Sequence, residues 1–281
     1  MMRSLWSAAS GMIAQQTNLD TISNNLSNVN TAGYKKDTVE FKSLLYQNLQ
    51  SVSTNNAGRN KPVPAQVGLG TRTGSITTVF TQGNMQETTN TNYLAIEGSG
   101  FFKVRDNDGN IAYTRDGSFT LQPAQGGGTM LCTAEGYPVL DQHDNIIRVP
   151  AGYKNGEYVV DKEGNLFVTN KDDENIPMTA QWNGQTYNQK VGLVQFNNPA
   201  GLYNAGSNLY TATVASGAAL EESTTQGLKT SLVHQGYLEM SNVQVADEMV
   251  NMIVAQRAYE MNSKAIQASD EMLQQANNLR S

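Results

Sequence analysis

The chain is poor in the residues that most often carry chemistry, because its 281 residues include only one cysteine and two histidines. The single cysteine, Cys132, cannot form an intrachain disulfide, so cross-links indicate nothing about the redox compartment. His143 and His234 lie far apart in the sequence, and neither stands in a metal-ligand spacing such as H-E-x-x-H. The sequence therefore predicts no catalytic residues, no metal site and no cofactor.

Charge of either sign is also scarce. Charged residues make up 16% of the chain, where about a quarter is usual. The net charge of -6 argues against nucleic acid as a partner. Uncharged polar residues fill the deficit. Such a surface suits close contact between copies of one chain, because like charges are not brought together, although an ordinary solvated surface has the same composition.

Long apolar runs are absent. No stretch approaches the ~18 consecutive apolar residues that a membrane-spanning helix needs, and the mean hydropathy is -0.45. The first residues, Met1–Trp6, lack the apolar core and the cleavage site of a Sec signal peptide. We therefore expect a chain that is not inserted in a membrane and that, if it leaves the cytoplasm, is exported without a cleaved signal peptide.

The N-terminal thirty residues contain no proline and carry a heptad pattern. Apolar residues recur at alternating spacings of three and four, with one polar position at Gln15. The row consists of Leu5, Ala8, Met12, Gln15, Leu19, Ile22, Leu26 and Val29. The spacing predicts a helix over residues 4–30, and Gly33 is a plausible helix stop.

The C-terminal region contains neither proline nor glycine after Gly236. Apolar residues recur every seven positions, at Leu238, Val245, Met252, Tyr259, Ile266 and Leu273. The neighbouring row begins with an apolar residue and continues with polar ones, at Met249, Gln256, Ser263 and Asp270. This pattern predicts a long helix with two kinds of neighbour.

The apolar members of both rows are the expected assembly interface between helices. They are Leu5, Met12, Leu19, Ile22, Leu26, Val29, Val245, Met249, Met252, Tyr259, Ile266 and Leu273. The alternative is that both helices pack on the globular part of their own chain, as ordinary amphipathic helices do.

Between the terminal helices the pattern changes twice. Residues 46–75 are rich in Asn, Pro and Gly, which predicts a long irregular arm. Residues 76–225 alternate at period two, as at Phe102 and Val104, with turn signals such as Asp108–Gly109 between the runs. The expected fold is therefore α+β, with N- and C-terminal helices paired as a coiled-coil layer, a central β-rich domain and an irregular connecting arm. The expected division is a helical domain of residues 1–33 and 237–281, connecting segments 34–75 and 226–236, and a β-rich domain of residues 76–225, which the family resemblance described below places outside the helices.

Several stretches resemble the signature motifs of one protein family. These stretches are Asn24–Thr31, Gly33–Lys35, Asn92–Phe102, Tyr113–Phe119, Gly236–Val243, Met249–Ile253 and Gln256–Asn262. Because motifs from both ends occur in the family's order, the chain is identified as a member of the bacterial flagellar rod and hook family. Further stretches resemble the family member that forms the distal rod, namely Arg3–Trp6, Gln15–Asn18, Tyr46–Leu49 and Val67–Thr71.

The resemblance implies a structural subunit and not an enzyme. Its terminal helices would form an inner coiled-coil layer around a channel, with the β-rich domain outside. It would polymerise into the distal rod, a drive shaft that crosses the periplasm in the flagellar basal body and transmits torque from motor to hook. Its implied partners are copies of itself, the proximal rod and hook proteins, the P- and L-ring proteins and the flagellar type III export apparatus.

Two alternatives stay open. A hook or proximal rod subunit of the same family would carry the same terminal motifs. A glycan-binding β module would need an aromatic face, for which the candidates are Trp182, Tyr187, Tyr203 and Tyr210. Core and hairpin aromatics are the simpler interpretation of these four residues.

Overall fold

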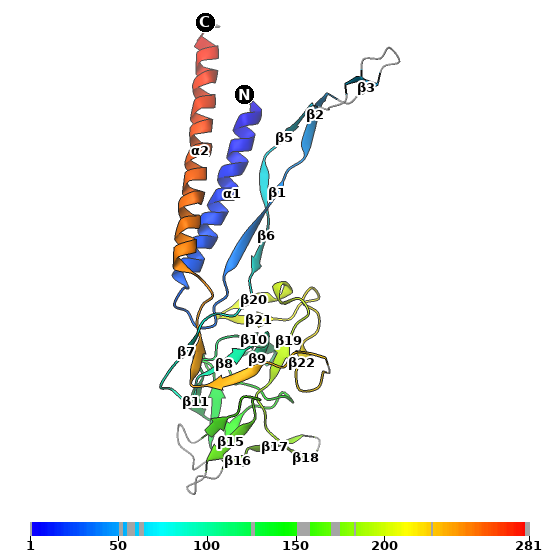
Figure 1. The fold of residues 1–281 in the computed structure, drawn as a ribbon, viewed down its shortest axis with the longest axis vertical. Coiled ribbons are helices and arrows are strands. Elements are labelled where there is room, and N and C mark those ends of the chain that lie inside the picture. The colour runs from blue at the N-terminus through cyan, green and yellow to red at the C-terminus, as the bar shows by residue number, and fades with distance from the viewer. Residues whose placement is uncertain are drawn as a thin grey trace. The chain divides into compact units, whose positions relative to one another are not determined.

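The computed structural model describes residues 2–50, 53–54, 60–61, 65–124, 127–150, 158–169, 175–182, 184–225 and 227–278 (Figure 1). The chain divides into two compact units. Unit 1 consists of Met1–Ser27, Asp37–Thr78 and Gln244–Ser281, and unit 2 consists of Asn28–Lys36 and Val79–Val243. Helices at both ends and a β-rich region between them confirm the expected α+β class.

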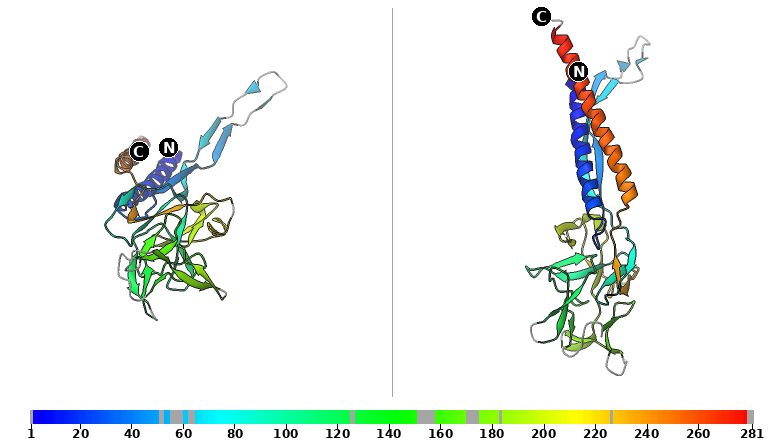
Figure 2. Two further views of the ribbon diagram at one scale, coloured as in Figure 1. Left: turned by 60° about the horizontal axis from the view of Figure 1, so that its bottom comes forward. Right: turned by 90° about the vertical axis from the view of Figure 1, so that its left-hand side faces the viewer.

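Two long helices of unit 1, α1 (Met2–Ser27) and α2 (Val245–Asn278), pack side by side. Figures 1 and 2 show the N- and C-termini at the same end of this pair. The Ser4 and Ser269 hydroxyl oxygens are 3.3 Å apart, and Gly11 lies against Asn262. A step of seven residues forward on α1 thus matches a step of seven backward on α2, so the helices are antiparallel. The N-terminal helix is confirmed to within a few residues of its expected ends.

The start of the C-terminal helix differs from the expectation. The heptad row placed Leu238 in this helix, but α2 begins at Val245. The prediction of a helix is therefore wrong for the residues before Val245. The preceding residues Tyr237–Glu239 form strand β24, which pairs antiparallel with β7 (Met85–Glu87). Leu238 matched the row only through its spacing, and pairing with a neighbouring strand overrides a weak helical preference.

The expected irregular arm is wrong for most of its described residues, which form an antiparallel ribbon. The pairs are β1 (Asp37–Ser43) with β6 (Thr71–Thr78), β2 (Tyr46–Gln50) with β5 (Ala65–Gly68), and β3 (Ser53–Thr54) with β4 (Asn60–Lys61). In β1, Val39 and Phe41 alternate with Glu40 and Lys42, a strand signal that the sequence analysis did not use, whereas β6 has no such alternation and no residue of either strand is fully buried. The turn signals at Asn55–Gly58, Pro62 and Pro64 lie outside the described residues.

Unit 2 is built from short antiparallel strands. Its largest sheet has the order β20-β21-β10-β9-β19-β22. The strands of this sheet are β9 (Phe101–Arg105), β10 (Ile111–Thr114), β19 (Leu193–Gln195), β20 (Tyr203–Gly206), β21 (Leu209–Thr211) and β22 (Leu220–Glu221), with the short helix η1 (Pro199–Gly201) before β20. The others are β8 (Leu94–Glu97), β11 (Thr120–Pro123), β12 (Thr129–Cys132), β13 (Arg148–Val149), β14 (Tyr158–Val160), β15 (Leu166–Thr169), β16 (Asn175–Pro177), β17 (Thr179–Trp182), β18 (Gln185–Asn188) and β23 (Leu232–Gln235).

The core of unit 2 confirms the period-two pattern. The alternating residues that become fully buried are Leu94, Ile96, Phe102, Val104, Phe119, Leu166 and Val168. A second cluster is aromatic and includes Phe101, Tyr113, Phe196 and Tyr210. The Asp108–Gly109 turn is also confirmed, because Gly109 has a φ of +83°, a conformation that glycine adopts without strain.

Candidate assembly surfaces and a buried ion triad

The expected interface residues of α1 are mostly half-buried in the single chain. Ile22 is buried, and the half-buried ones are Leu5, Met12, Leu19 and Leu26. Val29 is half-buried beyond the end of α1, in the turn that belongs to unit 2. The row therefore contributes to contacts within unit 1 but leaves apolar surface uncovered. Whether copies of the chain meet through it stays a prediction.

On α2 the expected row is split. Met252, Ile266 and Leu273 are half-buried, whereas Val245, Met249 and Tyr259 are exposed. The side chain of Met249 is 52% exposed, so the neighbouring row that it begins does not face α1 in the single chain.

The face of α2 that meets α1 carries small and polar residues that the sequence reasoning missed. Ala255 and Ser269 are almost completely buried, and Asn262 touches Gly11. These residues recur every seven positions, one place earlier than the row beginning at Met249. The signal was present as a heptad of small residues, but a search for apolar residues does not find it. Small side chains let the two backbones approach closely.

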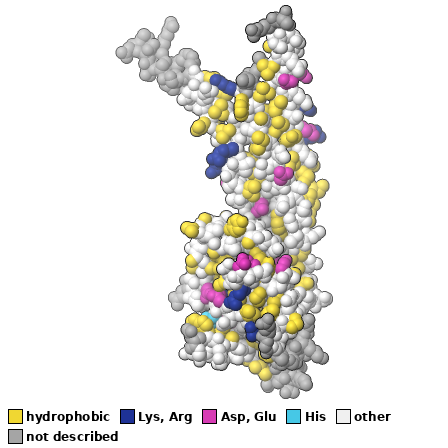
Figure 3. Space-filling view, turned by 180° about the vertical axis from the view of Figure 1, so that it is seen from behind, with side chains coloured by type: hydrophobic (Ala, Val, Ile, Leu, Met, Phe, Trp, Pro, Cys, Tyr) yellow, Lys and Arg dark blue, Asp and Glu magenta, His cyan; other side chains and the backbone are white. Residues whose placement is uncertain are grey.

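A stripe of large apolar side chains runs along another face of α2, and we call it the outer stripe. It consists of Val250, Ile253, Val254, Met261 and Met272, whose exposed fractions are 59%, 55%, 61%, 64% and 48%. Figure 3 shows apolar side chains along the helical part of the surface, with few charged ones among them. On α1, Trp6 and Ile13 are also exposed and lie seven residues apart. A row of exposed apolar side chains on one helix face is a candidate contact surface.

A buried ion triad lies inside unit 2, and each member comes from a different signature motif. Glu239 on β24 accepts hydrogen bonds from Lys35 Nζ at 2.6 Å and from Arg115 Nη1 at 3.2 Å. All three side chains are at most 1% exposed. Sequence reasoning used the motifs only as family signatures and assigned no role to these charges. The available signal was the presence of charged residues in three separated motifs.

Backbone groups complete the environment of the triad. Lys35 Nζ also donates to Thr81 O at 2.8 Å, and Gly83 N donates to Glu239 Oε1 at 2.9 Å. Burial lowers the pKa of Lys35, an effect that Glu239 partly offsets and Arg115 reinforces. Burial likewise lowers the pKa of Arg115, again against the pull of Glu239. One carboxylate therefore holds two cations that would be costly to bury without it.

The triad fastens three segments of unit 2 that are distant in sequence. Gly33 N donates to Glu239 O at 2.8 Å, which ties the segment before β1 to β24. Gly33 has a φ of +66°, and a Cβ there would lie 2.5 Å from Asp116 N. Asn242, after β24, accepts from Lys36 N at 2.8 Å and donates to Val79 O at 2.8 Å. The segments that enter and leave unit 2 are thus held together by charge and backbone contacts.

Of the four residues expected for a glycan-binding face, Trp182 and Tyr187 both contact His143 and Tyr203 is exposed, but Tyr210 is not on the surface. Tyr210 is buried and packs edge-on against Phe80 and Phe101. Trp182 instead stacks on His143, with ring centroids 4.4 Å apart. Among the residues that the structure describes, no group of three or more His, Cys, Asp or Glu side chains could hold a metal ion. Among the described residues, no helix is long and apolar enough to cross a membrane.

The family models and the known proteins that match this chain all belong to the flagellar rod and hook proteins. Three family models match: "Flagella basal body rod protein" over residues 5–35, "Flagellar hook protein FlgE/F/G D1 domain" over 95–168, and "Flagellar basal body rod FlgEFG protein C-terminal" over 234–279. The flagellar basal-body rod protein FlgG of Borreliella burgdorferi is 46% identical over 100% of this chain and 99% of its own length. FlgG of Buchnera aphidicola from Schizaphis graminum is 42% identical over 99% and 100%, and FlgG of Bacillus subtilis is 38% identical over 100% of both. The chain, with its paired terminal helices and its three motifs joined in one triad, therefore belongs to the FlgG family of flagellar basal-body rod proteins.

Proposed function

We propose that this chain polymerises head to tail into the distal rod of the flagellar basal body and there acts as a drive shaft between motor and hook. The observation that carries the assembly mechanism is the outer stripe of α2, an apolar surface that the single chain leaves uncovered. The FlgG family membership supports the rod over the hook, because the relatives named above are rod proteins. The role is structural and not enzymatic.

In the proposed filament the terminal helices form an inner layer of coiled coils around the channel, and the β-rich residues 76–225 lie outside. The small-residue face of α2 is occupied by α1 of the same chain. The outer stripe and the exposed pair Trp6 and Ile13 are left for helices of neighbouring copies. Each α2 then has two kinds of neighbour, one within its chain and one outside it. Such contacts are heterologous, and when they do not close into a ring they build a helical filament.

The proposed partners follow from the position of a distal rod. They are the proximal rod and hook proteins at its two ends and the P- and L-ring proteins around it in the periplasm. The proposed export route is the flagellar type III apparatus, without cleavage of a signal peptide. The support for these partners is the family membership.

Substitution of Val254 by Asp tests the assembly mechanism. Val254 lies in the outer stripe at 61% exposure, so the single chain should fold normally. Burying a valine contributes about 1.5–3 kcal/mol, and each 1.4 kcal/mol corresponds to about tenfold in an equilibrium. We therefore expect the concentration needed for filament formation, measured by sedimentation and electron microscopy, to rise at least about tenfold.

Gln256→Asp is the matched control, since Gln256 is exposed on the same helix outside the outer stripe. It adds the same charge and should polymerise nearly as the wild type does. If Val254→Asp also polymerised as the wild type does, α2 would not be the assembly surface.

A further inference from the structure

Val214 is a fully exposed apolar residue on a tightly hydrogen-bonded loop of unit 2. Single exposed apolar residues are common and need no explanation by themselves. Here the flanking residues bond to each other: Thr213 N donates to Ser216 Oγ at 2.9 Å, and Ser216 N donates to Thr213 Oγ1 at 3.2 Å. The turn therefore has a fixed shape and presents the valine outward.

Contacts with η1 fix the same loop from behind. Asn198 Nδ2 donates to Ala215 O at 3.1 Å, and Thr213 Oγ1 donates to Gly201 O. A Cβ at Gly201 would lie 2.7 Å from the backbone carbon of Ala215, so only glycine permits this approach. Since the loop is already ordered, a partner that covers Val214 would lose little conformational entropy.

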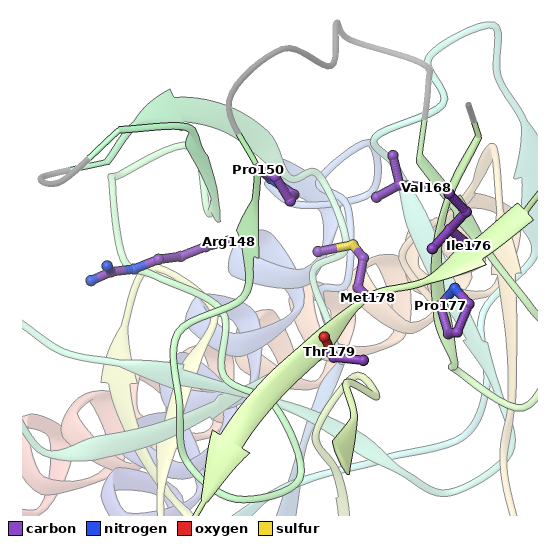
Figure 4. A pocket seen from close by; sticks show the side chains of 7 residues that line it. All are labelled: Arg148, Pro150, Val168, Ile176, Pro177, Met178 and Thr179. Atoms are coloured by element: carbon purple, nitrogen blue, oxygen red, sulfur yellow. The ribbon is translucent and has the colours of Figure 1, made fainter. Parts of the chain in front are cut away.

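Unit 2 also contains a small pocket of about 160 Å³, whose lining is polar and apolar in similar measure. Its lining residues are Arg148, Pro150, Val168, Ile176, Pro177, Met178 and Thr179. In Figure 4 Met178 lies in the middle, with Val168, Ile176 and Pro177 on one side and Pro150 and Arg148 on the other. Met178 and Val168 are buried and form the floor, whereas Ile176 is exposed at the rim. Arg148 is the only charged residue of the lining, and its aliphatic stem can cover an apolar group.

The size of the pocket indicates what it accepts. Pockets for drug-sized ligands usually measure about 300–1,000 Å³, which is larger than this one. A cavity near 150 Å³ holds a group as small as benzene. The pocket therefore fits one small apolar side chain, such as the isopropyl group of a valine.

Val214, which we call the knob, and the pocket lie at opposite ends of unit 2. Val214 follows β21, while β15 and β16 carry pocket residues Val168 and Ile176. Figure 1 shows β20 and β21 at one end of this unit and β15 and β16 at the other. Within one copy of unit 2 the knob therefore does not fill its own pocket. A contact that joins them between two copies is heterologous, and repetition of such a contact gives a filament.

We propose that Val214 of one subunit inserts into the pocket around Met178 of a neighbouring copy, forming a contact between β-rich units. This proposal rests on the proposed function as a filament subunit. It adds a second interface to the helical one, located entirely in unit 2.

Polymerisation of two charge variants tests the contact from both sides. Val214→Asp and Ile176→Asp place a carboxylate on the knob and at the rim of the pocket, and both positions are exposed, so the chain should fold. Each should raise the concentration needed for filament formation at least about tenfold. Val159→Asp is the control, because Val159 is an exposed valine of β14 that does not line the pocket.

Disulfide trapping identifies the pair directly. Chains with Val214→Cys are mixed with chains with Ile176→Cys, assembled and oxidised, while the native Cys132 stays buried. A cross-linked dimer that forms only in the mixture, and not with Val159→Cys in place of Ile176→Cys, supports the proposal. Normal filaments from both Asp variants together with no specific cross-link would overturn it and leave the proposed function intact. A wild-type chain that stays monomeric at every concentration would overturn both.

Discussion

Gly11 of α1 lies so close to Asn262 of α2 that a Cβ added to the glycine would come within 2.8 Å of the Asn262 side-chain nitrogen. A larger residue at position 11 would therefore fit against α2 only if the Asn262 side chain moved. Ser4 and Ser269, one heptad further along, are in contact through their hydroxyl groups. At these positions the contact between α1 and α2 is made by glycine and serine residues and not by large apolar side chains.

Replacement of Gly11 by Leu should separate the helices. Overpacking of a close contact costs about 1–3 kcal/mol, and the altered spacing would move the outer stripe out of register with its neighbours. We expect the concentration needed for filament formation to rise about tenfold or more. Gln16→Leu, an exposed position on the same helix, should have little effect. Equal behaviour of the two variants would show that helix spacing is unimportant for assembly.

The ion triad should respond unequally to the loss of its anion and of one cation. Glu239→Gln leaves Lys35 and Arg115 buried without a counter-charge, and breaking a buried pair in this way costs about 3–5 kcal/mol. Lys35→Met removes a cation whose burial is itself unfavourable and leaves Arg115 on Glu239, so it should cost clearly less. The measurement is urea unfolding followed by Trp182 fluorescence, with Trp6 replaced by Phe.

The surface pair between Glu97 and His234 provides the control for the triad. The two groups are 2.8 Å apart, but the Glu97 side chain is half exposed, and exposed pairs contribute about 0–1 kcal/mol. Glu97→Gln should therefore leave the unfolding midpoint almost unchanged. A loss as large as that of Glu239→Gln would contradict the importance of burial.

Tyr187 should make stability fall at alkaline pH. Its hydroxyl donates to the buried Asp141 and accepts from Asn145, and burial, aided by the bond to Asp141, raises the pKa of Tyr187 to about 12. Because the folded pKa is raised above the ordinary value of 10.0, the stabilisation is complete below pH 10 and is lost as the pH rises towards 12. Tyr187→Phe should be less stable than the wild type at pH 8 by about 1–2 kcal/mol. The difference in urea midpoint should shrink by pH 11, and an undiminished difference would argue against this titration.

The ribbon should stiffen the filament. Deletion of residues 46–70, replaced by an Asn-Gly turn, removes the outer strands of the ribbon and keeps all of β1 and β6. The ends can be joined because Ser43 pairs with Thr71 across the ribbon. We expect filaments that are curved or flexible in electron micrographs, with unit 2 unfolding at the wild-type urea concentration. Filaments that remain straight would show that the ribbon does not bridge adjacent subunits.

The buried strands and the terminal helices were predictable because their residues repeat at the period of the structure. Phe102 and Val104 alternate into one core, and the row through Ile22 follows one side of α1. The ribbon was predictable only in part. Val39 and Phe41 of β1 alternate with charged residues, but β6 is mostly Thr, Ser and Gly, and without a fully buried face nothing selects apolar residues along the whole ribbon.

The triad and the small-residue helix face were missed for a different reason. Lys35, Arg115 and Glu239 become neighbours only when segments up to 204 positions apart fold together, and no local period connects them. Gly11 and Ala255 contribute through their small volume, which leaves no apolar signal in the sequence. The motifs identified the family, but the geometry was needed to say what their charges do.

The position of Glu239 also has a consequence for incomplete chains. Lys35 and Arg115 belong to the first half of the sequence, whereas the carboxylate of Glu239, which both of them contact, lies near the C-terminal end of unit 2. A fragment that stops before β24 contains both cations and lacks the group that makes their burial tolerable. The fold of unit 2 therefore depends on its last strand, because only a chain that extends through β24 has the carboxylate that makes the burial of these two cations tolerable.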